Sequence, residues 1–267
     1  MSLAPGSMKH EHGGTPSTPS GSERSTPHTP PIPQFSANRA VHILSGGLDS
    51  TVLLYKIISE GFVPSVLSFD YGQRHSKELH YAELTCQKLS LPHMIVDLTS
   101  LQSLLRSTLT FDGPVPEGHY AAENMKATVV PNRNAIMLSI AYGYAVSIGA
   151  IAVFCGAHAG DHDIYPDCRQ EFFDQLNVAL KTGNEWASPP PTIRVPFLHV
   201  SKADIVCLGN NLNVPFYDTW SCYKGHDQHC GKCGTCVERR EAFALAEVED
   251  PQPFEDYNYW VGVTNAS

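Results

Sequence analysis

The sequence predicts an α/β fold in which a parallel sheet carries helices on both faces. Three observations lead to this prediction. Apolar segments of strand length alternate with amphipathic segments from residue 40 onward, a pattern typical of parallel strands joined by helical crossovers. The chain has 267 residues, of which 42% are hydrophobic, enough for one large α/β domain with an appendage. No internal repeat interrupts the pattern.

The first half of this region contains three expected strands. Residues 40–44 are mostly apolar and predict a buried strand, and a helix is expected after it, at 49–60. A second apolar run at 63–69 predicts another strand, and residues 76–89 have apolar side chains at helical spacing. A short third strand is expected at 93–97, before a long, weakly patterned stretch.

The second half continues the alternation. A buried helix is expected at 134–148, a fourth strand at 151–155 and a further helix at 168–181. A short strand at 193–195 precedes a helix at 201–211, which opens with a serine cap. Ligands of such sheets bind beyond the carboxyl ends of the strands, so functional residues are expected in the loops that follow the strands.

The ends of the chain differ in composition from the middle. Residues 1–37 are rich in Ser, Thr, Pro, Gly and His, which predicts a disordered tail. The folded domain is expected over 38–250, with a metal-binding loop at 219–240 and a C-terminal tail at 251–267. No apolar run approaches the roughly 20 residues of a membrane helix, and no signal-peptide core is present. These features predict a cytoplasmic protein with no membrane partner.

The charge balance favours a small-molecule substrate. The formal net charge is −9, from 18 Lys and Arg against 27 Asp and Glu. Proteins that bind nucleic acid usually present a basic face, because contacts with phosphates dominate their affinity. The sequence therefore predicts no nucleic-acid partner.

A glycine pair directly follows the first expected strand. Residues 45–51 read Ser-Gly-Gly-Leu-Asp-Ser-Thr and open the first helix. Glycines let the backbone approach a phosphate, and the free N–H groups of the first helical turn point at it. Asp49 is unusual in an anion site, and its natural use is to hold a divalent cation that bridges phosphates or to cap the helix. The segment is neither a Walker motif nor a dinucleotide fingerprint.

Four of the eight cysteines fall close together, at Cys222, Cys230, Cys233 and Cys236. Four thiolates at this spacing predict a closed tetrahedral zinc site that orders a loop, and an iron–sulfur cluster is the main alternative. The remaining cysteines are scattered, which argues against a disulfide scaffold.

The glycine-rich segment resembles the signature of the N-type ATP pyrophosphatases, which adenylate a carbonyl or carboxyl oxygen and release pyrophosphate. Further stretches extend the resemblance: Phe-Asp-Tyr-Gly-Gln-Arg-His at 69–75, Val-Pro-Asn-Arg-Asn at 130–134, Tyr-Pro-Asp-Cys-Arg at 165–169 and Thr-Trp-Ser-Cys-Tyr-Lys at 219–224. In this order, together with the cysteines and Val-Glu-Arg-Arg-Glu-Ala-Phe at 237–243, they resemble the 7-cyano-7-deazaguanine synthase family over about residues 40–245. The stretch at 156–163 departs from the family pattern, so His158, Asp161 and His162 receive no role.

The resemblance implies an ATP-dependent ligase of queuosine biosynthesis, with the fold of the adenine nucleotide alpha hydrolases. Its substrates would be 7-carboxy-7-deazaguanine, ammonia and Mg-ATP, and it would hold one structural zinc and form a homodimer. The nucleotide is expected along the glycine-rich segment at residues 45–51, which we call the phosphate loop, and at the end of the second strand. The residues expected to contact it are Leu44, Ser45, Gly46, Gly47, Leu48, Asp49, Ser50, Thr51, Val52, Leu53, Leu54, Asp70 and Gln73.

Three residues are expected to carry the chemistry. Asp49 holds the magnesium, Lys202 in a first helical turn meets a phosphate, and Arg133 meets the substrate carboxylate or the α-phosphate, since guanidinium matches oxyanions. Substrate contacts are expected from Asp167, Arg169, Trp220 and Tyr223. Two alternatives remain: a tRNA-modifying thiolase or lysidine-type ligase with the same loop, and a zinc-ribbon interaction module without catalysis.

Overall fold

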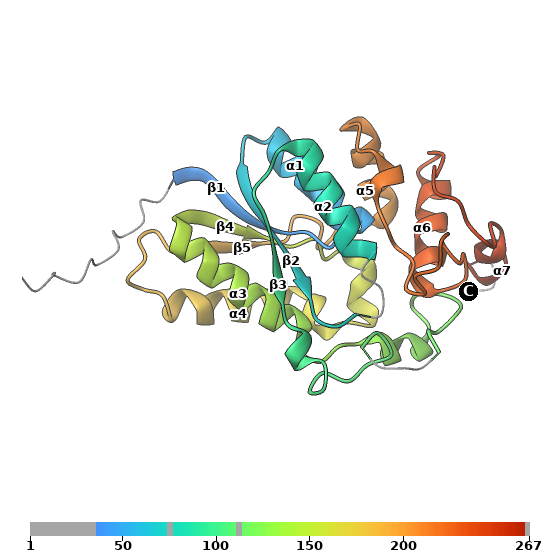
Figure 1. Ribbon diagram of the computed structural model, residues 1–267, viewed down its shortest axis with the longest axis horizontal. Helices are drawn as coiled ribbons and strands as arrows, with labels where there is room; N and C mark the ends of the chain where they lie inside the picture. Colours follow the sequence, from blue (N-terminus) through green and yellow to red (C-terminus); the bar gives the residue numbers. More distant parts are fainter. Residues whose placement is uncertain (1–35, 74–76, 111–113, 265–267) are drawn as a thin grey trace, which may run out of the picture. The chain divides into compact units, whose positions relative to one another are not determined.

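The computed structural model describes residues 36–73, 77–110 and 114–264, and within them it contains one parallel sheet (Figure 1). Its strand order is β3-β2-β1-β4-β5. All four neighbouring pairs are parallel. The strands are β1 (Ser36–Ile43), β2 (Val63–Asp70), β3 (His93–Asp97), β4 (Ala150–Phe154) and β5 (Thr192–Arg194). The predicted α/β fold with a parallel sheet is confirmed.

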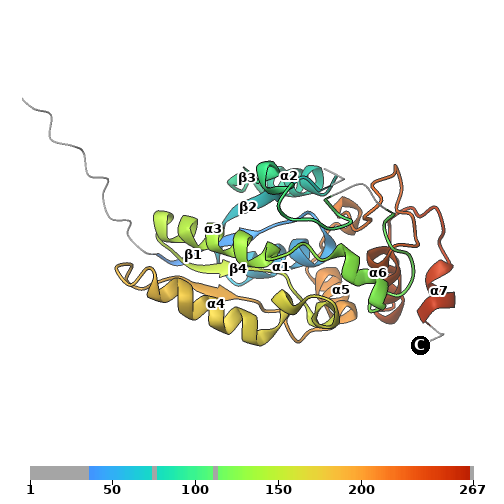
Figure 2. The same ribbon diagram turned by 90° about the horizontal axis from the view of Figure 1, so that it is seen from below.

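Helices cover both faces of this sheet, as Figures 1 and 2 show. The helices are α1 (Leu48–Ser59), α2 (Lys77–Leu89), α3 (Arg133–Ile148), α4 (Gln170–Thr182), α5 (Lys202–Asn211), α6 (Gly234–Leu245) and α7 (Tyr259–Thr264). One hydrophobic core joins the sheet to α1, α2, α5 and α6, and a second joins the opposite face to α3 and α4. No helix in the described part of the chain is long and apolar enough to cross a membrane.

The strand order places a switch point next to β1. The chain runs outward from β1 to β2 and β3, and then returns to the other side of β1 for β4 and β5. The connections that leave β1 and β4 therefore diverge, which opens a crevice at the carboxyl ends of these two strands. Gly156, directly after β4, lies so close to Ser50 that a Cβ would stand 3.2 Å from its Cα. The crevice thus has the predicted phosphate loop on one wall.

The observed elements start and end within a few residues of the predicted ones, with informative exceptions. β1 begins at Ser36, because its first, largely exposed residues pair with β4 through the backbone, which no apolar pattern reports. α4 begins at Gln170, because residues Pro166–Cys168 form a separate 3-10 turn. The expected N-terminal tail lies almost entirely outside the described ranges.

The weakly patterned stretch between β3 and α3 packs against the loop at residues 219–240, which contains the four clustered cysteines and is named the cysteine loop. It contains short 3-10 turns at Thr99–Leu101 and Glu123–Thr128. Glu117 forms an antiparallel bridge with Cys233, and the N–H of Gly118 donates to the carbonyl of Lys232 at 3.0 Å. This stretch obtains its structure from a distant partner, which explains why no local pattern predicts it.

A buried arginine connects α6 to the residues that follow it. Arg239 and Asp250 are both inaccessible to solvent and form two parallel bonds of 2.9 Å. The other donors of Arg239 reach the hydroxyls of Thr219 and Ser221 and the carbonyl of Phe216. All five N–H groups of the guanidinium are therefore bonded, as a charge in a dry interior requires.

We predict that Asp250→Asn lowers the free energy of unfolding by about 3–5 kcal/mol, because it leaves a buried guanidinium without its counter-ion. Urea denaturation of the purified protein measures this. Glu60→Gln, which removes an exposed i,i+4 partner of Lys56, is the matched control and is expected to cost no more than about 0.5 kcal/mol. A change below about 1 kcal/mol for Asp250→Asn would contradict the assignment.

Candidate active site

A cavity of about 240 Å³ lies at the carboxyl ends of the strands. The phosphate loop after β1 forms one side, and the segment after β4 forms the adjoining side. The starts of α2, α3 and α5 complete the walls, and the cysteine loop with α6 closes the end. Loops from distant parts of the sequence thus converge on one site, as the strand order requires.

The phosphate loop is folded around two serine hydroxyls. The Oγ atoms of Ser45 and Ser50 lie 2.9 Å apart, and the N–H of Gly47 donates to Ser45 Oγ at 3.1 Å. α1 begins at Leu48 with no side-chain cap. The N–H groups of its first turn have no partner within the helix, so they are available to an anion.

Gly46 is the tightest point of the loop. Its φ is +87°, and a Cβ there would stand 2.0 Å from the carbonyl oxygen of Glu78 in α2. Its own carbonyl accepts the N–H of Trp220 at 2.9 Å. α2 and the cysteine loop therefore hold the phosphate loop from two sides, and only glycine fits between them.

A buried group of charges adjoins the loop. Lys202 Nζ lies 3.2 Å from Asp49 Oδ2 and 2.6 Å from Glu238 Oε2. Burial lowers the pKa of Lys202, but these two carboxylates outweigh burial and raise the pKa above its usual value. Burial likewise raises the pKa of Asp49, and Lys202 and His158 outweigh it and lower the pKa. Lys202 is therefore an ammonium and Asp49 a carboxylate at neutral pH.

The segment that departs from the family pattern supplies a histidine to this group. The N–H of Gly160 donates to Nδ1 of His158 at 3.1 Å, and the N–H of His158 donates to Asp161 at 3.0 Å. With Nδ1 as acceptor, the hydrogen of the neutral ring is on Nε2. Nε2 lies 3.5 Å from Glu238 Oε1 and 3.9 Å from Asp49 Oδ2. A 3-10 turn thus aims a hydrogen-bond donor at the carboxylates.

Arg133, at the start of α3, also lines the cavity. Three tyrosines, Tyr71, Tyr165 and Tyr223, lie near its guanidinium, and the Tyr165 ring centre is 5.9 Å from its Cζ. Glu78 lines the cavity too. Burial raises the pKa of Glu78 to about 7, although Arg133 opposes the shift. The cavity therefore contains, besides the charges around Lys202, a second cation, a further carboxyl group and aromatic rings.

Some of the predicted nucleotide residues line the cavity, whereas Gly46, Asp70 and residues 51–54 are not among the lining residues. Leu44, Ser45, Gly47, Leu48, Asp49, Ser50 and Gln73 line the cavity. Thr51, Val52, Leu53 and Leu54 are buried and face the core behind the loop. Asp70 accepts the N–H of Gly72 at 3.0 Å, and Gln73 accepts the N–H of Tyr71 at 2.9 Å. Both side chains shape the turn after β2, and Gln73 additionally reaches the cavity.

The predicted substrate contacts also divide. Trp220 and Tyr223 line the cavity, and Trp220 stacks on Tyr81 with ring centres 5.8 Å apart. Asp167 accepts the N–H of Asn134 at 3.2 Å and so caps α3. Arg169 is exposed and donates to the carbonyl of His162 at 3.0 Å. The last two residues lie outside the cavity lining.

Five lining residues carry polar chemistry to which the sequence assigned no role: Tyr71, Glu78, His158, Asp161 and Glu238. Four of them fall in stretches that stand out in the sequence, but a stretch does not reveal which side chain faces the site. Glu78 stands in the first turn of an amphipathic helix, where an acid is ordinarily a solvated partner of the helix dipole. Only the packing of α2 against Gly46 shows that Glu78 instead lines the cavity.

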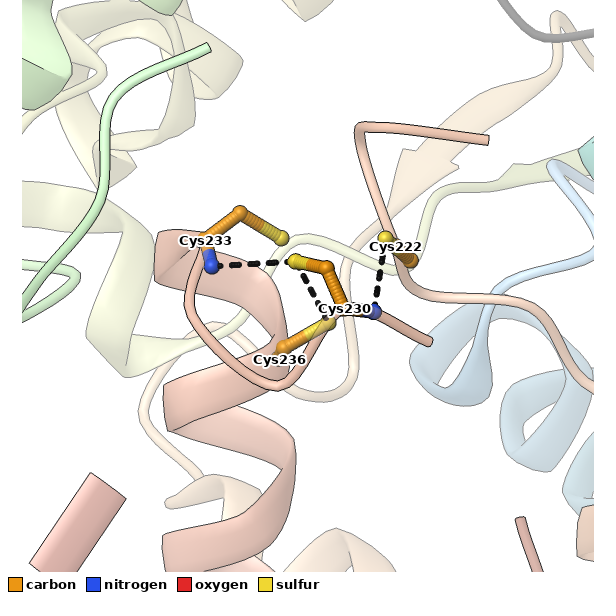
Figure 3. A group of neighbouring side chains, drawn as sticks. All are labelled: Cys222, Cys230, Cys233 and Cys236. Atoms are coloured by element: carbon orange, nitrogen blue, oxygen red, sulfur yellow. Dashed lines mark hydrogen bonds between the residues drawn. The ribbon is translucent and has the colours of Figure 1, made fainter. Parts of the chain in front are cut away.

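The four clustered cysteines form a compact, buried group beside the cavity (Figure 3). Their sulfur atoms all lie within 4.8 Å of one another. Backbone N–H groups of Lys224, Lys232 and Cys233 point at sulfur atoms at 3.3–3.4 Å. Such donors stabilise thiolates around a metal, so this donor set fits a tetrahedral ion. His229 instead accepts the N–H of Ser221 at 3.1 Å.

We predict that Gly46→Ala destabilises the fold and abolishes ATP binding, because the new methyl group would collide with α2. Gly61→Ala is the matched control: its φ is +86°, but nothing lies within 4 Å of the added Cβ. The control is expected to cost only the backbone strain of about 1–2 kcal/mol and to bind ATP normally. Thermal unfolding and titration with nucleotide measure both. Equal behaviour of the two variants would contradict the packing described.

Comparison with known proteins gives a consistent answer. The model of the family described as "Queuosine biosynthesis protein QueC" matches residues 39–247. A "7-cyano-7-deazaguanine synthase" of Rhizobium rhizogenes is 52% identical over 85% of this chain and 96% of its own length. One of Brucella ovis is 51% identical over 83% of this chain and 96% of its own.

Among solved structures, an NMN synthetase of Francisella tularensis is similar at a TM-score of 0.45 and 17% identity, over 86% of each chain. That similarity is too low to bear on function. The family model spans every residue that lines the cavity, including the phosphate loop, and also the four clustered cysteines beside it. The chain belongs to the QueC family of queuosine biosynthesis proteins.

Proposed function

We propose that this chain converts 7-carboxy-7-deazaguanine and ammonia to 7-cyano-7-deazaguanine at the expense of ATP. The observation that carries the proposal is the identity of 51–52% with curated 7-cyano-7-deazaguanine synthases over most of both chains. The geometry supports it, because a loop suited to phosphates and the guanidinium of Arg133 line the same cavity.

The chemistry begins with a poor electrophile, a carboxylate. Attack of the carboxylate oxygen on the α-phosphorus of ATP forms an acyl adenylate and releases pyrophosphate. Ammonia then adds to the acyl carbon and expels AMP, which leaves the amide. A second adenylation, at the amide oxygen, followed by loss of AMP and of protons from nitrogen, gives the nitrile.

The phosphate loop is suited to stabilise the pyrophosphate that leaves in each of the two adenylation steps. The free N–H groups at the start of α1 and the hydroxyls of Ser45 and Ser50 offer donors to the β- and γ-phosphates. Lys202 is already placed beside this helix end by Asp49 and Glu238. We propose that it turns from these carboxylates to the phosphates when nucleotide binds, and so stabilises the charge on the departing pyrophosphate.

Arg133 is the group that we assign to the acyl end of the substrate. Its side chain lines the cavity, and three tyrosines lie near its guanidinium. A guanidinium pairs with two oxygens at once. It would hold the substrate carboxylate in line with the α-phosphate, where positioning supplies much of the rate enhancement.

We infer that the cysteine loop holds zinc and that magnesium accompanies the ATP. The four buried sulfurs suit a closed zinc site whose role is to order the loop. Asp49, with Oδ1 buried and without a partner in the described residues, is the carboxylate best placed to receive magnesium, which would neutralise phosphate charge when bound.

The proposal also includes the oligomeric state of the protein and its location in the cell. We expect a homodimer that acts in the cytoplasm, where thiolate sites persist without disulfide formation. The net charge of −9 supports a small-molecule substrate and argues against tRNA as the substrate. The tRNA-modifying alternative has no structural observation in its favour.

We predict that the purified protein, with 7-carboxy-7-deazaguanine, ammonium and Mg-ATP, forms the nitrile, detected by mass. Arg133→Lys is expected to lower kcat/KM for the carboxylate at least about 100-fold, because lysine cannot form the paired contact. Arg169→Lys, at an exposed position away from the cavity, is the matched control and is expected to leave the rate unchanged.

Absence of the nitrile from a preparation that binds ATP and metal would contradict the substrate assignment. It would move a tRNA-modifying activity to first place, which incubation with unmodified tRNA then tests. Equal rates for both arginine variants would remove Arg133 from the acyl site but leave the reaction itself standing.

We predict one zinc per chain by elemental analysis, and its loss in Cys233→Ser. Because the N–H of Trp220 reaches Gly46 from the same loop, loss of the metal is also expected to weaken ATP binding. Cys207→Ser, at an exposed cysteine outside the cluster, is the control for both measurements. Iron in place of zinc, with absorption of a cluster in the visible range, would contradict the metal assignment.

A further inference from the structure

We propose that the carboxylate of Glu78 binds the N1–H and 2-amino edge of the deazaguanine ring and so selects this substrate. The proposal rests on the proposed function and deepens it, because it assigns the end of the substrate that does not react. Four observations support it: the position of Glu78, its lack of a partner, its relation to Arg133, and the chemistry of the two substrate ends.

The position of Glu78 is fixed by the backbone. Glu78 stands in the first turn of α2, and its carbonyl oxygen presses on Gly46, where a Cβ would be 2.0 Å away. Glu78 and the next residue, Leu79, both line the cavity. The first turn of α2 therefore forms a wall of the site and lies directly beside the phosphate loop.

Glu78 differs from the other acids of the cavity because its side chain has no partner among the residues that the structure describes. Asp49 and Glu238 share Lys202, and Asp161 accepts the N–H of His158. Glu78 makes no side-chain hydrogen bond and no ion pair with any residue in the ranges that the structure describes. When no ligand is bound, a carboxyl group in the cavity wall that lacks hydrogen-bond partners costs the protein free energy. A substrate that donates two hydrogen bonds would compensate this cost.

Glu78 and Arg133 together match the two ends of the substrate. Both line the cavity and influence each other electrostatically, yet they form no ion pair with each other. The substrate carries a carboxylate on its five-membered ring and two parallel N–H donors on the far edge of its six-membered ring. Arginine suits the first end, and a carboxylate, with two acceptor oxygens in one plane, suits the second.

Aromatic side chains complete the complement to a flat ring. Tyr71 and Tyr223, both near Arg133, line the cavity together with Trp220. Planar heterocycles stack on such rings. The cavity thus offers aromatic surface for the ring and a charged contact suited to each of its ends.

The experiment compares two substrates on three proteins. The substrates are 7-carboxy-7-deazaguanine and its analogue without the 2-amino group. The proteins are the wild-type chain, Glu78→Gln, and Glu83→Gln, a control at an exposed acid of the same helix. The measurements are kcat/KM for each substrate, KM for ATP, and the melting temperature of each protein.

We expect the wild-type chain and Glu83→Gln to prefer the natural substrate by about 10- to 100-fold, the usual value of one paired contact. Glu78→Gln is expected to lose most of this preference, because one oxygen is replaced by a donor, while KM for ATP changes little. A residue that only stabilises the start of α2 would lower stability or activity for both substrates alike.

The outcomes separate the two proposals. No turnover of the natural substrate by the wild-type chain overturns the proposed function, and the assignment of Glu78 with it. Turnover with equal rates for both substrates on the wild-type chain overturns the assignment of Glu78 alone, whether or not the variant folds. Undiminished preference in Glu78→Gln also overturns it.

Discussion

The site depends on the fit of one glycine between two neighbours. Gly46 has the carbonyl of Glu78 against its α-carbon, and its own carbonyl oxygen accepts a hydrogen bond from the N–H of Trp220. The first contact ties the phosphate loop to α2, and the second ties it to the cysteine loop. Gly46 therefore fixes the relative positions of three parts of the site. These are the cysteine loop, the first turn of α2 that carries Glu78, and the end of the first strand.

The charged side chains of the cavity fall into two groups. Around Lys202 and His158, three carboxylates (Asp49, Glu238 and Asp161) lie close together, and they suit the arrival of a cation with the nucleotide. Arg133 lies near aromatic rings in the same cavity. Under the proposed function, a nucleotide at the first group and a planar carboxylate at Arg133 would meet within one cavity, where the reacting atoms must be aligned.

Local patterns in the sequence predicted the strands, most of the helices and the phosphate loop, because apolar periodicity and a glycine pair after a strand are local signals. The cysteine cluster was equally readable, since its ligands follow one another closely. The strand order, the capping role of Asp167 and the buried pair of Arg239 and Asp250 depend on contacts between distant segments. Glu78, His158 and Glu238 escaped assignment for the same reason: only packing shows that they face the cavity.

The central claim is that the substrate carboxylate is adenylated at this loop, and oxygen labelling tests it most directly. The substrate would be prepared with ¹⁸O in its carboxylate and converted with unlabelled ATP in unlabelled water. If the carboxylate is adenylated, the label will appear in the phosphate of AMP, since the carboxylate oxygen leaves with the nucleotide. Label in inorganic phosphate, with ADP as the nucleotide product, would contradict it and indicate phosphorylation instead.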